Sequence, residues 1–64
     1  MPVVEIKLFE GRSVEIKRRI AKEVTEILVK HLQIPEDAVI IIFEDIKKEN
    51  FAQAGRLAVE ETSS

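Results

Sequence analysis

Cysteine is absent from this chain, and glycine, proline and aromatic residues are scarce. The 64 residues include two glycines, two prolines and three aromatic residues, all of them phenylalanine. Without cysteine no disulfide can stabilise the fold, and a single histidine leaves no Cys/His cluster with the spacing of a metal site. No glycine-rich phosphate loop is present either. The sequence therefore predicts no metal site and no cofactor.

The small size of the chain limits what it can bury. A domain of this length buries only about 60% of the surface that its unfolded chain exposes, so an isolated monomer would be marginally stable. Shared interfaces enlarge the core, and 45% of the residues are hydrophobic. We therefore expect residues 1–64 to form one domain that assembles into a homo-oligomer.

The sequence also lacks an excess of positive charge and a long apolar run. Its net charge is −2, and three phenylalanines offer little for base stacking, so nucleic acid is not an expected partner. The longest apolar run, Ala38 to Phe43, is far shorter than the roughly 20 residues that cross a bilayer. The N-terminus has no apolar segment of a signal peptide. We expect no membrane partner and a cytoplasmic protein.

The first half of the chain has the pattern of a strand followed by a helix. Residues 3–9 alternate between apolar and other positions, as on a strand with one buried face. Gly11 suits a turn, and Ser13 can cap a helix whose apolar residues recur at helical spacing. Its basic residues, Lys17 among them, are expected on the solvated face. The apolar residues of the helix are Ile16, Ile20, Val24, Ile27, Leu28 and Leu32.

The second half predicts another strand and a short hairpin. Pro35 disfavours helical geometry at Ile34 and should end the helix. Residues 38–43 are apolar on both faces, which is typical of a parallel strand covered on both sides. Strand, helix and strand in this order predict a right-handed βαβ unit of the α/β (α+β) class. One helix covers only one face of the sheet, so the other face should meet another subunit. We expect a charged loop at residues 45–50, a hairpin at 51–59 and a frayed end at 60–64.

Pro2 is the first candidate for chemistry, because it stands at the head of the first strand. Inside a chain its nitrogen is an amide without basicity. If Met1 is removed, Pro2 becomes a secondary amine that can take a proton from carbon. The alternative is that Pro2 only starts an edge strand, as prolines often do.

Two further residues allow a functional and an ordinary interpretation. Arg12 precedes the helix N-terminus, where its guanidinium and the first N–H groups could bind a carboxylate. The alternative is an ion pair with Glu10 or Glu15. Phe51 is either a buried anchor for the tail or the wall of an apolar pocket. His31, near the helix C-terminus, interacts favourably with the helix dipole, and we assign it no chemistry.

In order and spacing, these features resemble the 4-oxalocrotonate tautomerase family over nearly the whole chain. The resemblance is carried by Pro2, by Glu10-Gly11-Arg12-Ser13 before a long helix, by Ile34-Pro35 after it, and by a β-branched strand and a loop ending in Phe51. It implies a homohexamer, a trimer of βαβ dimers; a trimer is the alternative. In that assembly Pro2 would be the base that moves a proton between carbons of an enol or dienol acid. Arg12 would reach a neighbouring subunit's site to bind a carboxylate, and Phe51 would be a pocket wall.

One position departs from that family. Where its best-known members place an arginine that binds substrate oxygen, this chain has Ile40, which makes the expected site more apolar. The family's namesake substrate, a dicarboxylate, is therefore less expected than a monoacid or a hydrophobic enol. Two functions follow. The first is an isomerase acting on a small enol or α-keto acid, and the second, which Ile40 favours, is a non-catalytic oligomer that binds a small ligand or is structural. Beyond the helix, Arg56 is the only other arginine.

Overall fold

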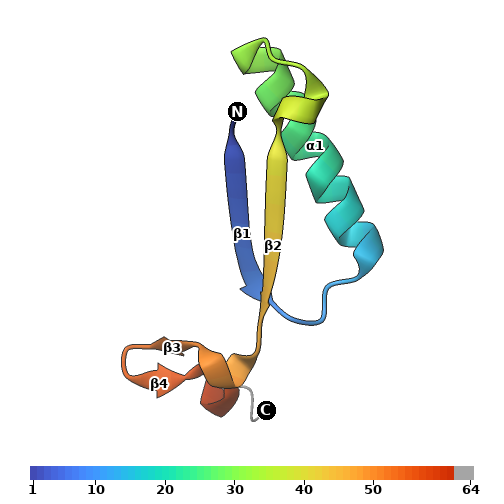
Figure 1. Cartoon of the computed structure of the whole chain (residues 1–64). Coiled ribbons are helices and arrows are strands. Elements are labelled where there is room, and N and C mark those ends of the chain that lie inside the picture. Colours follow the sequence, from blue (N-terminus) through green and yellow to red (C-terminus); the bar gives the residue numbers. More distant parts are fainter. Residues whose placement is uncertain (62–64) are drawn as a thin grey trace.

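The computed structural model describes residues 1–61 and shows a βαβ unit followed by a small hairpin (Figure 1). Two strands and the helix form the main unit, and short 3₁₀ helices connect the remaining elements. The expected α+β class with parallel strands is confirmed. In chain order the elements are β1 (Val3–Phe9), α1 (Val14–Leu32), a 3₁₀ helix (Glu36–Ala38), β2 (Ile40–Ile46), a 3₁₀ helix (Lys48–Asn50), β3 (Ala52–Gln53), β4 (Arg56–Leu57) and a 3₁₀ helix (Ala58–Glu61).

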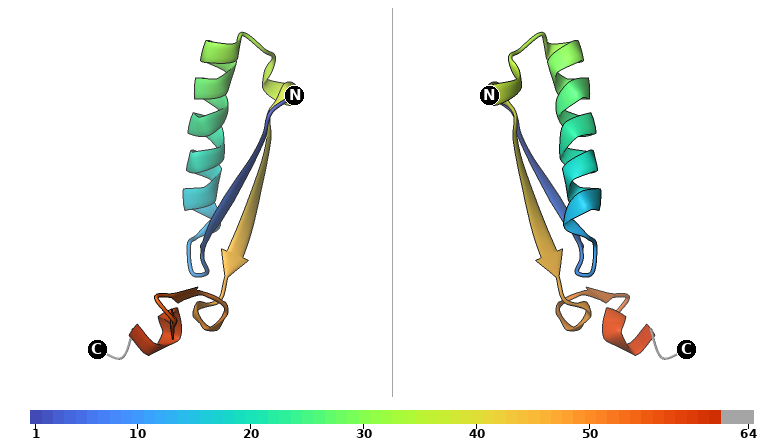
Figure 2. Two further views of the ribbon diagram at one scale, coloured as in Figure 1. Left: turned by 90° about the vertical axis from the view of Figure 1, so that its left-hand side faces the viewer. Right: turned by 90° about the vertical axis from the view of Figure 1, so that its right-hand side faces the viewer.

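Strands β1 and β2 pair in parallel from Val3 opposite Ile40 to Phe9 opposite Ile46. Residues opposite one another in a sheet share a face, and successive residues along a strand alternate between faces. The predicted apolar face of β1 is half-buried, and the residues between are exposed. This face lies toward α1, which runs along one side of the sheet (Figure 2).

Among residues 1–61, no element forms a layer over the other face of the sheet (Figure 2). Val3 is 55% exposed and Ile42 47% exposed on that face. Lys7 and Glu44, which are opposite one another in the register, form an ion pair of 3.5 Å there. The single chain thus leaves uncovered the apolar face for which the sequence predicts a neighbouring subunit.

Helix α1 begins at the predicted cap and ends slightly before the predicted stop. The Ser13 hydroxyl accepts a hydrogen bond from the Ile16 N–H at 3.1 Å, which satisfies one of the first-turn donors. At the other end Gln33 is left-handed, with φ of 56°, and its N–H donates to the Val29 carbonyl at 2.9 Å. The helix therefore ends at the left-handed Gln33, two residues before Pro35.

The apolar stripe of α1 is wider than the surface that the sheet covers. Ile20, Val24 and Leu28 are half-buried, whereas Ile16 and Ile27 remain exposed. The sheet therefore covers only some of the predicted apolar residues of the helix. Part of it faces outward from the βαβ unit.

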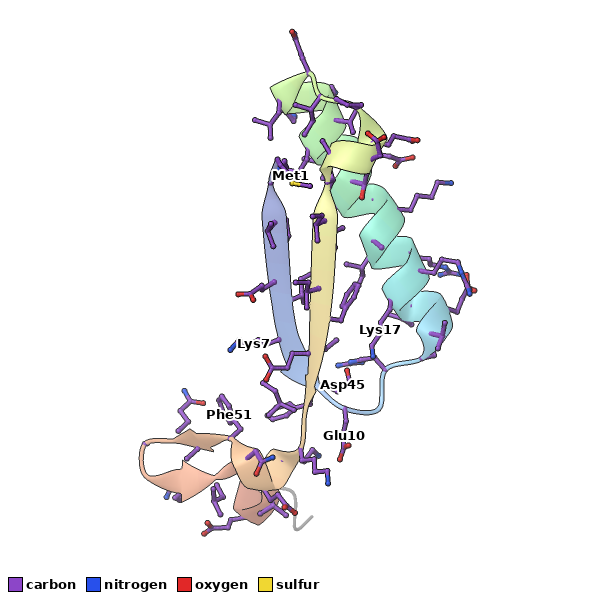
Figure 3. All side chains as sticks on the ribbon, in the orientation of Figure 1. Met1, Lys7, Glu10, Lys17, Asp45 and Phe51 are labelled. Atoms are coloured by element: carbon purple, nitrogen blue, oxygen red, sulfur yellow. The ribbon has the colours of Figure 1, made fainter. Side chains whose placement is uncertain are left out.

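The position of Lys17 shows that two predictions are wrong: that Lys17 lies on the solvated face of the helix, and that Asp45 lies in a loop. Its side chain is 24% exposed and its Nζ lies 2.8 Å from Asp45 Oδ1, so it faces the sheet and is not on the solvated face (Figure 3). Asp45 in turn belongs to β2, which continues to Ile46, and not to the predicted loop. The ion pair gives a carboxylate on the helix-facing side of the sheet a partner, which lets the strand extend further than its apolar run.

The C-terminal segment forms the predicted hairpin. Gln53 pairs with Arg56, and the two residues between them, Ala54 and Gly55, have φ of 55° and 79°, as in the two-residue turns that favour hairpins. Glu60 is not frayed, because its carboxylate accepts a hydrogen bond from the Leu57 N–H at 3.1 Å. The rest of the predicted frayed end, residues 62–64, lies outside the described residues.

Residues 1–60 of the isolated chain form no closed core. No residue among 1–60 is fully buried, and the accessible surface is 5317 Å². A compact monomer of 7.3 kDa would expose about 4,200 Å². The radius of gyration is 15.3 Å, against about 11 Å for a compact chain of this length. These values support the expectation that other subunits complete the core.

Candidate functional site

Pro2 lies immediately before β1 and is fixed by the sheet. Its carbonyl accepts a hydrogen bond from the Ile40 N–H at 3.0 Å, which adds one more rung at the start of the parallel pair. Proline has no N–H to donate, so the head of a strand is a position where no ladder bond is lost. Pro2 is half-buried, whereas Met1 before it is 85% exposed. The ring is thus held in place on its carbonyl side.

Ile40 is the residue of β2 whose backbone N–H bonds to the Pro2 carbonyl. It opens β2, is half-buried and lies opposite Val3 in the register. Its side chain has neither a charge nor a hydrogen-bond donor. At the end of the sheet where Pro2 lies, position 40 therefore contributes an apolar side chain, as the sequence predicts.

Arg12 lies at the opposite end of the sheet from Pro2. It is exposed in the connection between β1 and α1 (Figures 1 and 2). The seven residues of β1 separate the two ends by about 23 Å at 3.3 Å per residue. The carboxylate of Glu15, one of the alternative partners of Arg12, instead pairs with Arg18 at 2.6 Å and Arg19 at 3.7 Å.

Phe51 also lies at the end far from Pro2, between the sheet and the hairpin (Figure 3). Its ring meets that of Phe9 edge-on, with centroids 5.3 Å apart and an interplanar angle of 86°. Edge-to-face pairs of this kind contribute about 0.5–1.5 kcal/mol beyond their buried area. Phe51 is nevertheless 38% exposed, so it anchors the hairpin and still offers part of its ring to a pocket.

The exposed side of Phe51 borders a hollow of about 570 Å³. Its walls come from the end of β1, from the turn after β2 and from the hairpin. Among the lining residues, the sequence predicts a pocket wall only at Phe51, and it singles out Arg56 only as the one other arginine beyond the helix. The lining residues of the hairpin occupy alternate positions along its strands, a pattern that the sequence contains. No local pattern, however, links the hairpin to the end of β1. The lining residues include Phe9, Lys48, Phe51, Gln53, Arg56 and Ala58.

The four predicted site residues therefore form two groups within one chain. Pro2 and Ile40 are together at one end of the sheet, and Arg12 and Phe51 are at the other. A single site containing all four requires residues from different chains, as the resemblance implies for Arg12.

The His, Cys, Asp and Glu side chains of residues 1–61 form no group of three or more that could hold a metal ion. No helix in this part of the chain combines the length and the apolar character needed to cross a membrane.

Comparison with known proteins identifies the family to which this chain belongs. The profile of the tautomerase enzyme family matches residues 2–60, and the chain belongs to this family. A probable tautomerase of Ralstonia nicotianae is 44% identical over 61 residues, covering 95% of this chain and 94% of that protein. A probable tautomerase of Lactococcus lactis is 46% identical over 57 residues, covering 89% and 93%.

Solved structures give the same result for the fold. A 4-oxalocrotonate tautomerase isozyme from Methylibium petroleiphilum superposes with a TM-score of 0.90 at 34% identity, covering 97% of each chain. TomN, a homologue of 4-oxalocrotonate tautomerase from the tomaymycin biosynthetic pathway, superposes with a TM-score of 0.91 at 28% identity, covering 98% of this chain and 97% of the other. The resemblance predicted from the sequence is confirmed. Family membership supports a tautomerase, and so an isomerase, activity.

Proposed function

We propose that this protein is a keto–enol tautomerase in which the amine of Pro2 is the general base. The observation that carries the proposal is the position of Pro2, held at the head of β1 by the Ile40 N–H. The family profile begins at the same residue, which supports a role for Pro2 as the terminal residue. Met1 is exposed, so its removal costs the fold little.

In the proposed reaction the neutral ring amine of Pro2 moves one proton. It takes the proton of the enol hydroxyl, the oxygen's electron pair forms the carbonyl, and the electron pair of the carbon–carbon double bond takes the proton back at carbon. In the reverse direction Pro2 takes the proton from carbon. No redox partner is needed, because the substrate only exchanges an O–H bond for a C–H bond. Ile40, whose N–H bonds to the Pro2 carbonyl, has an apolar side chain and so brings no negative charge that would hold the amine protonated.

The other predicted residues take roles that depend on assembly. We place Arg12 of a neighbouring subunit at the substrate carboxylate, because a guanidinium donates paired hydrogen bonds to such a group. Phe51 of a neighbouring subunit is a wall of the same pocket. The open sheet face and the missing core favour assembly with other subunits. We propose a homohexamer, with a trimer as the alternative, and a cytoplasmic location. Because Ile40 cannot pair with a second anion, the substrate class is an enol or α-keto monoacid with a hydrophobic body.

The test is the substitution Pro2→Ala in a protein whose intact mass shows that Met1 has been removed. Loss of a positioned general base typically lowers a rate by about 10²- to 10⁴-fold. Alanine leaves a primary amine, so we expect the enol–keto conversion of phenylenolpyruvate, followed by ultraviolet absorbance, to fall by about 10²-fold without vanishing. An unchanged rate would reject Pro2 as the base. Wild-type protein with Met1 retained should be nearly inactive, since Pro2 is then an amide.

A further inference from the structure

Arg12 lies in a short connection whose start is fixed to the end of β2. The Glu10 N–H donates to the Ile46 carbonyl at 3.0 Å, one residue beyond the last pair of the parallel strands, Phe9 with Ile46. Gly11 follows with φ of 111°, a conformation that residues with a side chain rarely adopt. The chain therefore turns at one defined residue, and Arg12 comes directly after that turn.

The end of the same connection is fixed to β2 through Lys17. Its N–H donates to the Ser13 carbonyl at 3.2 Å in the first turn of α1. Its ammonium lies 2.8 Å from Asp45 Oδ1 and 3.0 Å from Asp45 Oδ2 (Figure 3). The Lys17 side chain is 24% exposed and that of Asp45 44%, so salt screens this pair less than a fully solvated one. Lys17 thus joins the residue that follows Arg12 to the sheet.

The two attachments end on consecutive residues of β2, Asp45 and Ile46. A connection held at both ends has less backbone freedom to lose when a ligand binds, and binding already has to immobilise the long side chain of Arg12. Apolar side chains could join helix and strand at this point without desolvating two charges. The ion pair instead fixes the Lys17 ammonium close to both oxygens of one carboxylate, which sets the position of the first turn of α1 on the sheet.

We propose that Lys17 is a positioning residue for Arg12. Its ion pair with Asp45 holds the first turn of α1 on β2, and so holds the guanidinium of Arg12 in place for the substrate carboxylate of a neighbouring subunit. The inference rests on the proposed role of Arg12 as a carboxylate ligand and does not depend on Pro2 as the base. Neither Lys17 nor Asp45 touches the substrate.

The test is a double-mutant cycle between Lys17 and Arg12, measured by isothermal titration calorimetry of the assembled protein with phenylacetate. This probe has a carboxylate and an apolar body but no enol, so it binds without reacting. We expect Lys17→Met, which removes the charge, to weaken binding by about tenfold, the effect of losing one hydrogen bond to a charged group. In an Arg12→Gln background the same substitution should have no further effect, because the guanidinium that Lys17 positions is gone.

Three further variants separate positioning from general stability. Lys17→Arg keeps the charge and should retain most of the affinity. Asp45→Asn removes the charge from the other side of the pair and should weaken binding as Lys17→Met does; it replaces Lys17→Met in the cycle if that variant fails to assemble. Lys22→Met is the matched control, because it removes the charge of an exposed lysine from the same helix, and it should leave phenylacetate binding unchanged.

Four results would overturn the inference. Wild type could fail to bind phenylacetate, or Arg12→Gln could leave its affinity unchanged, which would show that Arg12 is not the carboxylate ligand. Assembled Lys17→Met and Asp45→Asn could bind as wild type does. Either could weaken binding equally with and without Arg12, which would show that the ion pair acts only on stability. A protein that gives the expected cycle but does not convert phenylenolpyruvate loses the proposed function and keeps this inference, whereas an active enzyme without coupling between Lys17 and Arg12 has the opposite meaning.

Discussion

Substitution of Ile40 by arginine is the sharpest test of why this chain should avoid dianionic substrates. Ile40 lies next to Pro2 and its backbone N–H holds the Pro2 carbonyl at 3.0 Å. The backbone bond survives any side-chain change, so the substitution alters the charge near the base without releasing Pro2. Position 40 is only half-buried, which leaves room for a longer side chain whose apolar stem lies on the sheet.

The size of the effect follows from the bonds that arginine adds. A hydrogen bond to a charged group contributes about 1.5–3 kcal/mol, and each 1.4 kcal/mol corresponds to about tenfold in affinity or rate. We expect Ile40→Arg to raise the ratio of kcat/KM for the diacid 2-hydroxymuconate over that for phenylenolpyruvate by about ten- to a hundredfold. Wild type should prefer phenylenolpyruvate, because an unpaired carboxylate against isoleucine carries a desolvation cost.

The assay is steady-state ultraviolet kinetics on both compounds with proteins of verified mass and assembly. Ile40→Gln is the matched control, since its amide adds hydrogen-bonding groups without adding a charge. It should move the ratio much less than arginine does. A wild type that prefers the diacid, or a ratio that arginine leaves unmoved, would refute the proposed role of position 40 and would make Arg56 the next residue to test for the second carboxylate.

The remaining predictions concern the assembly and the helix. Multi-angle light scattering on wild type at micromolar concentration should show a hexamer, and a stable monomer would refute both the assembly and the shared site. Ile42→Lys puts a charge on the open sheet face, so it should dissociate the assembly in the same measurement; a normal oligomer would mean that this face is solvated. Ser13→Ala removes the hydrogen bond to the Ile16 N–H and should lower the free energy of unfolding in urea by about 1 kcal/mol per chain, while Ser13→Asp should retain most of it.

The local elements could be predicted because their causes are local. The alternation at Val4, Ile6 and Leu8 defines one face of a strand, and the Ser13 hydroxyl caps a helix within four residues of itself. The end of β2 could not be predicted in this way. Asp45 reads as the start of a charged loop, but its partner Lys17 comes from α1, and the partner of the neighbouring Glu44, Lys7, comes from β1. A charge belongs to a strand when another element supplies its counter-ion, and the sequence around it does not contain that information.

The candidate site divides along the same line. Pro2 and Arg12 are recognisable because each is unusual where it stands, a proline that heads a strand and a cation ahead of a helix. The residues that surround the candidate site could not be predicted, because they are set by the register of β1 with β2 and by the fold of the hairpin. Ile40 meets Pro2 only because β2 starts opposite Val3. Lys48 and Arg56 border one hollow because a two-residue turn folds the chain back toward Phe9.

The length of β1 between Pro2 and Arg12 also sets how this enzyme would respond to dilution. If a site takes its base from one chain and its carboxylate ligand from another, a dissociated chain carries every necessary residue and yet has no working site. Specific activity would then depend on protein concentration through the same equilibrium that governs folding, because the core too is shared. A substitution that destabilises the interface would therefore also remove the activity, even where it lies far from Pro2 and leaves every residue of the site unchanged.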